Sequence, residues 1–255
     1  MEPCTIGRRG EVALITLRAP CGNALTAALV RALEAALERA DRSAARAVVL
    51  TGKGAAFCVG LDLFQHHRAS RATVAAFVRA YSRLLRRLFA LEQQLVIALN
   101  GHAYAGGAVL LLTGDYRIAA RDARTRVAFG GVALGLPLPR VPALVVRLAL
   151  ADHAQRRLLL TGEAVALERA IELGLIDETV PARSPARRGT RARPRARALP
   201  DRLPHRQARP APRDAARMDA RRCARATSSS SARGAAATQT AIGNVRARLL
   251  AKKGR

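Results

Sequence analysis

The sequence contains no tryptophan, and aromatic residues make up only 3% of its 255 residues. Few rings are therefore available to stack on nucleic-acid bases. The four cysteines form no CxxC pair and lack the spacing of metal ligands, so we expect free thiols and no metal site. No nicotinamide or flavin motif is present. Together these absences leave a reducing, cytoplasmic location and an ordinary packed core as the expectation.

Long apolar runs are also scarce. No apolar segment precedes the first predicted strand, so we expect no secretory signal. The best candidate for a membrane span is 95–112, which is barely long enough and contains Asn100 and His102. We interpret it as a buried strand, a turn and a helix, and we expect no membrane partner.

Acidic residues are few beside the basic ones, which gives a net charge of +26. The excess is uneven: residues 1–182 hold 23 basic and 15 acidic side chains, whereas residues 183–255 hold 21 and 3. Most of the net positive charge thus lies in residues 183–255, so the net charge of the whole chain says little about residues 1–182.

What the first 181 residues do have is an alternation of strand and helix patterns, typical of a layered α/β domain. Thr26 and Ser70 are suited to cap two amphipathic helices, at 27–39 and 72–91. Further helices are expected from the Gly106-Gly107 pair and from 161–163, the latter closed by Gly174. The predicted strands are 11–17, 47–51, 95–99, 116–119 and 175–180.

The pattern changes after residue 181. Residues 182–237 are rich in Arg and Pro and lack aliphatic periodicity, so we expect them to be disordered or poorly packed. Residues 238–255 regain a helical pattern. A reading-frame disruption would explain the middle segment; binding of RNA or another polyanion is the alternative, although the segment has no interleaved aromatic residues.

Five ordered blocks within the first 180 residues resemble the enoyl-CoA hydratase/isomerase (crotonase) superfamily. The strongest is LVIALNGHAYAGGAVLLLTGDYRIA at 95–119, and GKGAAFCVGLDL at 52–63 resembles a loop usually written FxxGxDL. The other blocks are PCGNALT at 20–26, VALGLPLP at 132–139 and LLLTGEAVALERAIELGLIDETV at 158–180.

This resemblance implies an α/β fold in which ββα units repeat as a spiral, assembled into a homotrimer or hexamer if the C-terminal region permits. It implies an acyl-CoA thioester substrate, with coenzyme A as part of the substrate and no separate cofactor. The shared chemistry is stabilisation of an enolate-like oxyanion by two backbone N–H groups. By resemblance these donors belong to Leu61 and Gly107, the second at the start of a helix whose positive end faces the oxyanion.

Other residues of the same blocks are expected to contact the substrate. Asp62 is tempting as an acid, but its position favours a helix N-cap that anchors the loop. Asn23 and Ala24 are expected to act mainly through their backbone, and Tyr104 as a lining residue. The complete expected substrate-binding set is Asn23, Ala24, Val59, Gly60, Asp62, Tyr104 and Gly106.

The glutamates that hydratases of this family place around water have no counterpart. The first position corresponds to Leu110, and the second to Gly131 or, in another register, near Phe129. Substitutes would be His102, Tyr104, Glu92 or Glu163, each of which also has a structural interpretation. A noncatalytic acyl-CoA-binding relic therefore stays open beside an enzyme, and a polyanion-binding protein on this fold is a third alternative.

Overall fold

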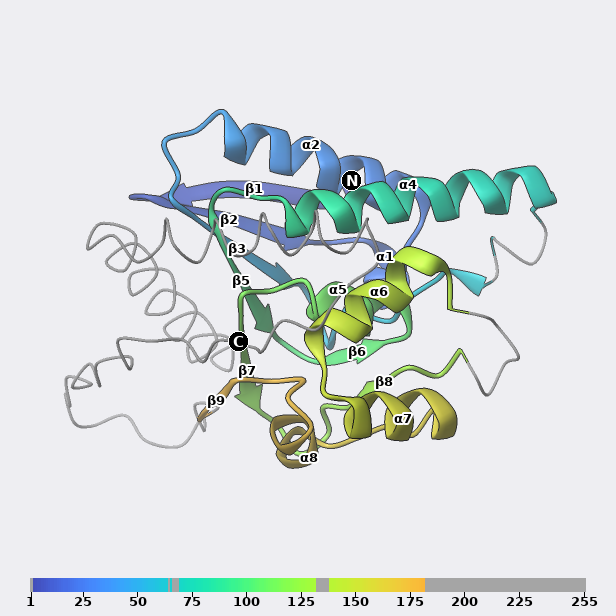
Figure 1. The fold of residues 1–255 in the computed structure, drawn as a ribbon. Helices are drawn as coiled ribbons and strands as arrows, with labels where there is room; N and C mark the ends of the chain where they lie inside the picture. Colours follow the sequence, from blue (N-terminus) through green and yellow to red (C-terminus); the bar gives the residue numbers. More distant parts are fainter. Residues whose placement is uncertain (1, 64, 66–68, 132–137, 182–255) are drawn as a thin grey trace, which may run out of the picture.

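The computed structural model describes residues 2–63, 65, 69–131 and 138–181 (Figure 1). The expectations for 182–237 and 238–255 lie outside these residues. The strands are β1 (Cys4–Arg9), β2 (Val12–Leu17), β3 (Ala47–Gly52), β4 (Ala56–Cys58), β5 (Gln94–Leu99), β6 (His102–Tyr104), β7 (Tyr116–Arg121), β8 (Val127–Ala128) and β9 (Glu178–Pro181). The helices are α1 (Pro20–Asn23), α2 (Ala27–Asp41), α4 (Arg71–Phe89), α5 (Gly106–Leu111), α6 (Arg140–Ala149), α7 (Asp152–Thr161) and α8 (Leu167–Glu172).

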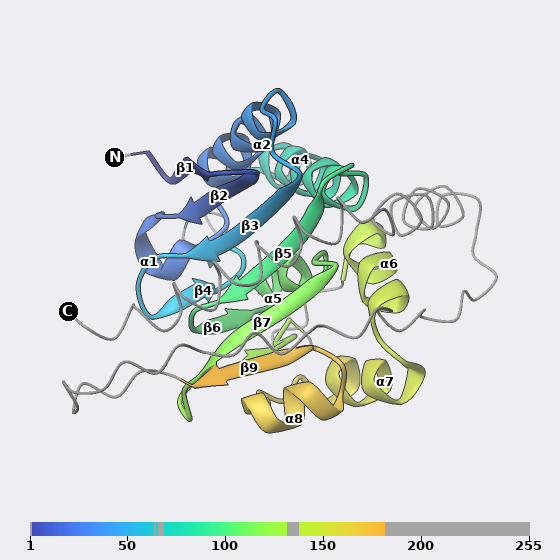
Figure 2. The same cartoon turned by 90° about the vertical axis from the view of Figure 1, so that its left-hand side faces the viewer.

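Three successive ββα units follow the initial hairpin: β3-β4-α4, β5-β6-α5 and β7-β8-α6. In each unit the first strand joins a large sheet, ordered β1-β2-β3-β5-β7-β9, and the second joins a small sheet, ordered β4-β6-β8. Each turn of the chain thus advances both sheets by one strand (Figure 2). The spiral of ββα units expected from the sequence is confirmed.

The central strands of the large sheet, β3 and β5, are buried on both faces, as the strands of parallel sheets generally are. Apart from the antiparallel β1-β2 hairpin its strands run parallel, and all six residues of β3 and of β5 are buried. Alternate residues divide between two apolar clusters: Val48 and Leu50 face the main core, whereas Val49 packs with Val96 on the other side. Near-continuous apolar strands, not alternating ones, are the sequence pattern that this architecture requires.

The two predicted helix caps are present. The hydroxyl of Thr26 accepts a hydrogen bond from the Leu29 N–H at 3.1 Å, and that of Ser70 accepts one from the Thr73 N–H at 3.2 Å. Each satisfies an N–H that the first helical turn leaves without a partner.

The prediction that a helix begins at 161–163 is wrong. Gly162 instead closes α7 in the left-handed conformation (φ +64°), and α8 begins only at Leu167. The pattern was ambiguous because glycine is common just after a helix as well as in the turn before one. Gly174, at φ +71°, does follow the end of α8 as predicted.

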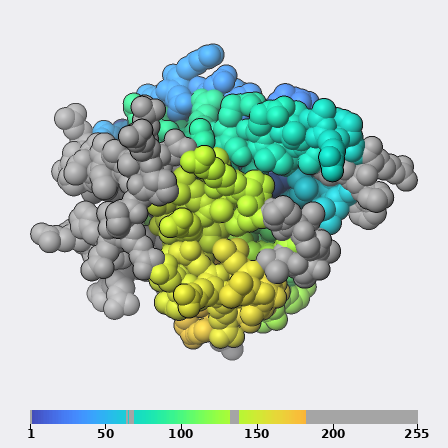
Figure 3. Space-filling view, turned by 45° about the vertical axis from the view of Figure 1, so that its right-hand side comes forward, coloured from blue at the N-terminus to red at the C-terminus, as the bar shows by residue number. Residues whose placement is uncertain are grey.

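Helices α4, α6 and α7 lie side by side along one face of the molecule (Figure 3). Their buried faces carry large apolar side chains, among them Leu84, Leu85 and Leu88 of α4 and Val145 of α6. No helix among the described residues is long and apolar enough to cross a membrane. The interpretation of 95–112 as strand, turn and helix is confirmed by β5, β6 and α5.

Candidate functional site

The first loop of the candidate site follows β4. Gly60 has φ +87°, a conformation that only glycine adopts without strain, and its carbonyl accepts a hydrogen bond from the Leu25 N–H at 2.7 Å. The Asp62 N–H donates back to the Leu25 carbonyl at 3.3 Å. These two bonds use the carbonyl of Gly60 and the N–H of Asp62, the residues on either side of Leu61. The N–H of Leu61 itself takes no part in this pairing.

The second loop joins β6 to α5 through an unusual residue. Ala105 has φ +47° and ψ −116°, a strained conformation for a residue with a Cβ. Its N–H donates to the Ala128 carbonyl at 2.8 Å, and its carbonyl accepts from the Val109 N–H at 3.1 Å, so both peptide groups are held. These bonds therefore fix the peptide that carries the Gly106 N–H.

The two loops are in contact. A Cβ built on Gly60 would lie 2.6 Å from the Tyr104 carbonyl oxygen and 3.0 Å from the Gly106 nitrogen. A Cβ on Gly107 would come within 2.0 Å of the Cys58 carbonyl oxygen. Glycine is thus required here for close approach of the two backbones, a requirement independent of any ligand.

The amides at this junction have no protein acceptors. Among the described residues, the N–H groups of Leu61, Gly106 and Gly107 donate no hydrogen bond to another protein group. Gly107 is buried, whereas Leu61 and Gly106 are partly exposed. Helix α5 has only six residues, so these individual N–H groups matter more than the helix dipole invoked from the sequence.

The side chain of Asn23 binds the backbone that leads into the first loop. It is fully buried, and its Nδ2 lies 3.0 Å from the Ala56 carbonyl, 3.1 Å from that of Phe57 and 3.2 Å from that of Lys53. Asn23 itself has φ +60°, the last of three consecutive left-handed residues. The sequence predicted a backbone role for Asn23; the structure adds a side chain that joins α1 to the β3-β4 turn.

Two neighbours have supporting positions. Ala24 is buried, and Val59 is partly exposed, with its N–H donating to the Gly22 carbonyl at 3.2 Å. Asp62 accepts a hydrogen bond from the Gln65 N–H at 3.1 Å, which confirms the predicted capping bond.

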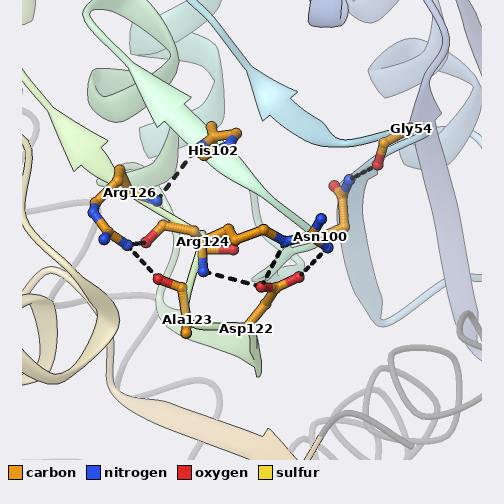
Figure 4. Close-up of polar contacts among 8 residues, drawn as sticks. Gly54, Asn100, His102, Asp122, Ala123, Arg124 and Arg126 are labelled. Carbon is orange, nitrogen blue, oxygen red and sulfur yellow. Dashed lines mark hydrogen bonds and ion pairs between the residues drawn. The ribbon is translucent and has the colours of Figure 1, made fainter. Parts of the chain in front are cut away.

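His102 and Tyr104 are partly exposed residues of β6, and Figure 4 shows His102 beside Arg126. Their rings stack with centroids 5.3 Å apart, and the Tyr104 hydroxyl lies 3.0 Å from His102 Nδ1. The Arg126 N–H also donates to Nδ1 at 3.2 Å, so Nδ1 acts as an acceptor in this contact. Only the carbonyl of Tyr104 is shown facing Gly60, so a lining role for its ring stays a prediction.

No carboxylate occupies α5, whose sequence GGAVLL is apolar in every register; Leu110 and its neighbours Val109 and Leu111 are fully buried. Phe129 is buried in the main core, and the sequence of 129–137 contains no acid. Of the proposed substitutes, Glu92 is an exposed residue between α4 and β5.

Glu163 was interpreted as a first-turn helix charge, and this is wrong because no helix begins there. It forms an ion pair with Arg157 of α7, which lowers the pKa of the Glu163 carboxyl. It is therefore an exposed carboxylate held by arginine, the opposite of the raised pKa that a general acid needs.

Two buried groups beside the site escaped the sequence prediction. The Tyr81 hydroxyl, from α4, donates a 2.6 Å hydrogen bond to the Gly106 carbonyl, and burial raises its pKa well above the usual value. Burial also raises the pKa of the Cys58 thiol to about 12. Both residues look like ordinary core positions in sequence, and only the contact of α4 with α5 brings Tyr81 to the glycine turn.

A shallow open hollow of about 500 Å³ lies elsewhere, beside the first turns of α4. It is lined by Ala69, Arg71, Val74, Ala75, Val78 and Arg79. None of these belongs to the two glycine loops, so the hollow is not the junction of unpartnered amides.

The ββα spiral, with the two glycine loops in contact, defines a crotonase-type fold. Residues 7–205 match the family model described as enoyl-CoA hydratase/isomerase, and the chain belongs to that superfamily. It is 32% identical over 180 residues to enoyl-CoA delta isomerase 3 of Arabidopsis thaliana, covering 68% of this chain and 75% of that protein. It is 30% identical over 172 residues to the mitochondrial human enoyl-CoA delta isomerase 1, and this match covers 67% of this chain and 57% of that protein.

Solved structures agree. The apo enoyl-CoA isomerase of Mycobacterium tuberculosis superposes with a TM-score of 0.68 at 25% identity, over 98% of this chain and 93% of that one. An enoyl-CoA hydratase of Mycobacterium smegmatis gives a TM-score of 0.65 at 29% identity, over 70% of each chain.

Proposed function

We propose that this protein binds an acyl-CoA thioester and stabilises the enolate formed from it, as an enoyl-CoA hydratase/isomerase-type enzyme. The observation that carries the proposal is the contact of the two loops at Gly60 and Gly106, beside N–H groups of Leu61, Gly106 and Gly107 that have no acceptor among the described residues. Two such donors aimed at one oxygen stabilise charge that develops only during reaction.

The second donor comes from the Gly106-Gly107 turn. The family resemblance favoured Gly107; we also propose Gly106 as a candidate, because it is more exposed and its nitrogen lies 3.0 Å from a Cβ built on Gly60. We propose that Leu61 and this turn hold the thioester oxygen, and that Asn23, Ala24, Val59, Gly60, Asp62 and Tyr104 shape the surrounding substrate site.

The reaction we favour is one that depends mainly on the oxyanion site. Both segments expected to supply glutamates lack acids, and each missing acid or base reduces rate by about 100-fold to 10,000-fold. Hydration through two glutamates is therefore disfavoured. Double-bond migration, for which relatives such as those above are named, removes a proton from C2 and returns one to C4, so a single acid–base group can serve where hydration uses two.

The test is a panel of 2-enoyl-CoA and 3-enoyl-CoA esters of several chain lengths with purified full-length protein. Loss of the conjugated enoyl thioester absorbance reports hydration of 2-enoyl esters, and its gain reports migration from 3-enoyl esters. We expect micromolar binding and measurable migration. Absence of binding by any ester would overturn the proposal.

A second candidate, a noncatalytic acyl-CoA-binding protein, is favoured by the wholly apolar α5. The same panel separates the two: saturable binding without turnover of any ester supports the noncatalytic protein. A polyanion-binding role for 183–237 is a weaker alternative, tested by whether RNA affinity disappears when these residues are deleted.

Assembly and location are further proposals. A trimer or hexamer follows from family membership, and sedimentation of the full chain tests it. The cytoplasm is proposed because Cys4, Cys21 and Cys58 are free, although relatives include peroxisomal and mitochondrial proteins.

A further inference from the structure

Tyr81 is a buried ionisable group for which the proposed chemistry has no direct use. Its ring lies in the core between α4 and α5, 6% exposed, stacked on Phe77 with ring centroids 6.2 Å apart. A tyrosine hydroxyl in an apolar core is costly without a partner. Tyr81 finds that partner in a single group, the Gly106 carbonyl at 2.6 Å.

We propose that Tyr81 is a positioning residue, whose hydroxyl fixes the Gly106-Gly107 peptide and so aims the Gly107 N–H at the thioester oxygen. The inference rests on the proposed acyl-CoA function and assigns to it a residue outside the glycine loops.

The geometry follows from peptide planarity. In a trans peptide the carbonyl of one residue and the N–H of the next point in opposite directions. With the Gly106 carbonyl held toward Tyr81, the Gly107 N–H is directed away from α4. A hydrogen bond to the carbonyl also polarises the peptide and strengthens its N–H as a donor.

The turn needs this external support. Gly106 and Gly107 lack the Cβ atoms that would restrict their backbone, and they follow the strained Ala105. The Cys58 carbonyl confines Gly107 from one side, at the 2.0 Å Cβ approach noted above. Tyr81 binds the Gly106 carbonyl, so contacts from both β4 and α4 act on the peptide between these two glycines.

The experiment measures carbonyl polarisation directly. A saturated acyl-CoA with a ¹³C-labelled thioester carbonyl, which cannot be turned over by hydration or isomerisation, is bound to the full-length wild type, Tyr81→Phe, Tyr116→Phe and Phe77→Leu. Tyr116→Phe also removes one tyrosine hydroxyl bond, which joins Tyr116 on β7 to Glu178 on β9 and involves neither glycine loop. Phe77→Leu loosens the packing of Tyr81 while keeping its hydroxyl.

We expect a downfield carbonyl shift in the wild type, Tyr116→Phe and Phe77→Leu, and less than about half of that shift in Tyr81→Phe, since a misaimed donor forfeits much of its stabilisation. An equal shift in Tyr81→Phe and the wild type, or an equal loss in Phe77→Leu, overturns the role of the hydroxyl. A wild type that binds without any shift, or does not bind, overturns the proposed function itself.

If Tyr81→Phe does not fold, 3-fluorotyrosine incorporation decides the question, because it keeps the ring and makes the hydroxyl a stronger donor. With Tyr116 and Tyr104 replaced by Phe, only Tyr81 carries the label. A larger carbonyl shift than in the matched unlabelled protein supports the proposal, and an unchanged shift overturns it.

Discussion

The carbonyl oxygen of Cys58 lies against Gly107 so closely that a Cβ at residue 107 would approach it to 2.0 Å. Because the obstructing atom belongs to the backbone of β4, it cannot rotate away as a side chain would. The start of α5 and the end of β4 are therefore one rigid unit, on which the proposed donors depend.

Replacing Gly107 by alanine forces α5 away from β4. We expect Gly107→Ala to lower the free energy of unfolding by about 1–3 kcal/mol and to weaken thioester binding. Denaturant unfolding and acyl-CoA titration measure the two effects. Gly7→Ala is the control, since a Cβ on Gly7 meets nothing within 4 Å; equal behaviour of the two variants would contradict the rigid unit.

Asn23 combines three carbonyl contacts with a left-handed backbone. We expect Asn23→Ala to lower the free energy of unfolding by about 2–4 kcal/mol, because buried carbonyls lose their donor and alanine is strained at φ +60°. Asn23→Gly relieves only the strain and should recover about 1 kcal/mol. Full recovery by glycine would show that the side-chain bonds contribute nothing.

Arg117 of β7 is 3% exposed and binds Asp177 through two hydrogen bonds, at 2.9 Å from Nε and 2.8 Å from Nη2. Asp177→Ala leaves the guanidinium buried without its carboxylate, and we expect a loss of about 3 kcal/mol in denaturant unfolding. The exposed Arg169-Glu172 pair is the comparison, where Glu172→Ala should change stability by less than about 0.5 kcal/mol. Similar losses of stability in Asp177→Ala and Glu172→Ala would show that burial does not determine how much an ion pair contributes to stability.

Thiol reactivity should follow burial. Burial raises the pKa of both Cys4 and Cys58 to about 12, whereas Cys21 is exposed. At pH 8 an aromatic disulfide reagent should label Cys21 in the native protein and reach Cys4 and Cys58 only after unfolding. Peptide mapping of the labelled cysteines checks this; rapid native labelling of Cys58 would contradict the burial of β4.

The same raised pKa values fix the sign of a pH effect. An unfolded thiol ionises near 9, whereas the folded ones keep their protons to about 12. Above pH 9 the unfolded state therefore binds fewer protons, and the free energy of unfolding should fall as pH rises toward 12. Replacing Cys4 and Cys58 by alanine should flatten that decline, as measured by unfolding at pH 8 and pH 10.

Much of the fold could be predicted because long elements carry strong patterns. The caps Thr26 and Ser70 and the apolar strands near 47–51 and 95–99 were found where expected. Other elements were not predicted: β4 and β6 have three residues each, too few to show a period, and the ten-residue helices α6 and α7 were also missed. Gly162 was assigned to the wrong side of its turn because glycine ends one helix as readily as it precedes another.

The site was predictable only through its backbone. In the sequence, Gly60 and the Gly106-Gly107 pair indicate places where the backbone is closely approached. The family resemblance indicated that these two loops belong to one site. Tyr81 could not be found in this way, because its helical position is that of any core residue and its hydrogen bond joins residues 25 apart. The pair Arg117 and Asp177 is likewise invisible until β7 and β9 are aligned.

The most direct test of the convergent amides compares a saturated acyl-CoA thioester with the matched thioether, which lacks the carbonyl oxygen, by amide-resolved NMR of ¹⁵N-labelled protein. The thioester should move the Leu61 proton and that of Gly106 or Gly107 downfield and bind about 10-fold more tightly, as expected for two added hydrogen bonds. Identical amide shifts and affinities for the two ligands would mean that no oxygen is held between these loops.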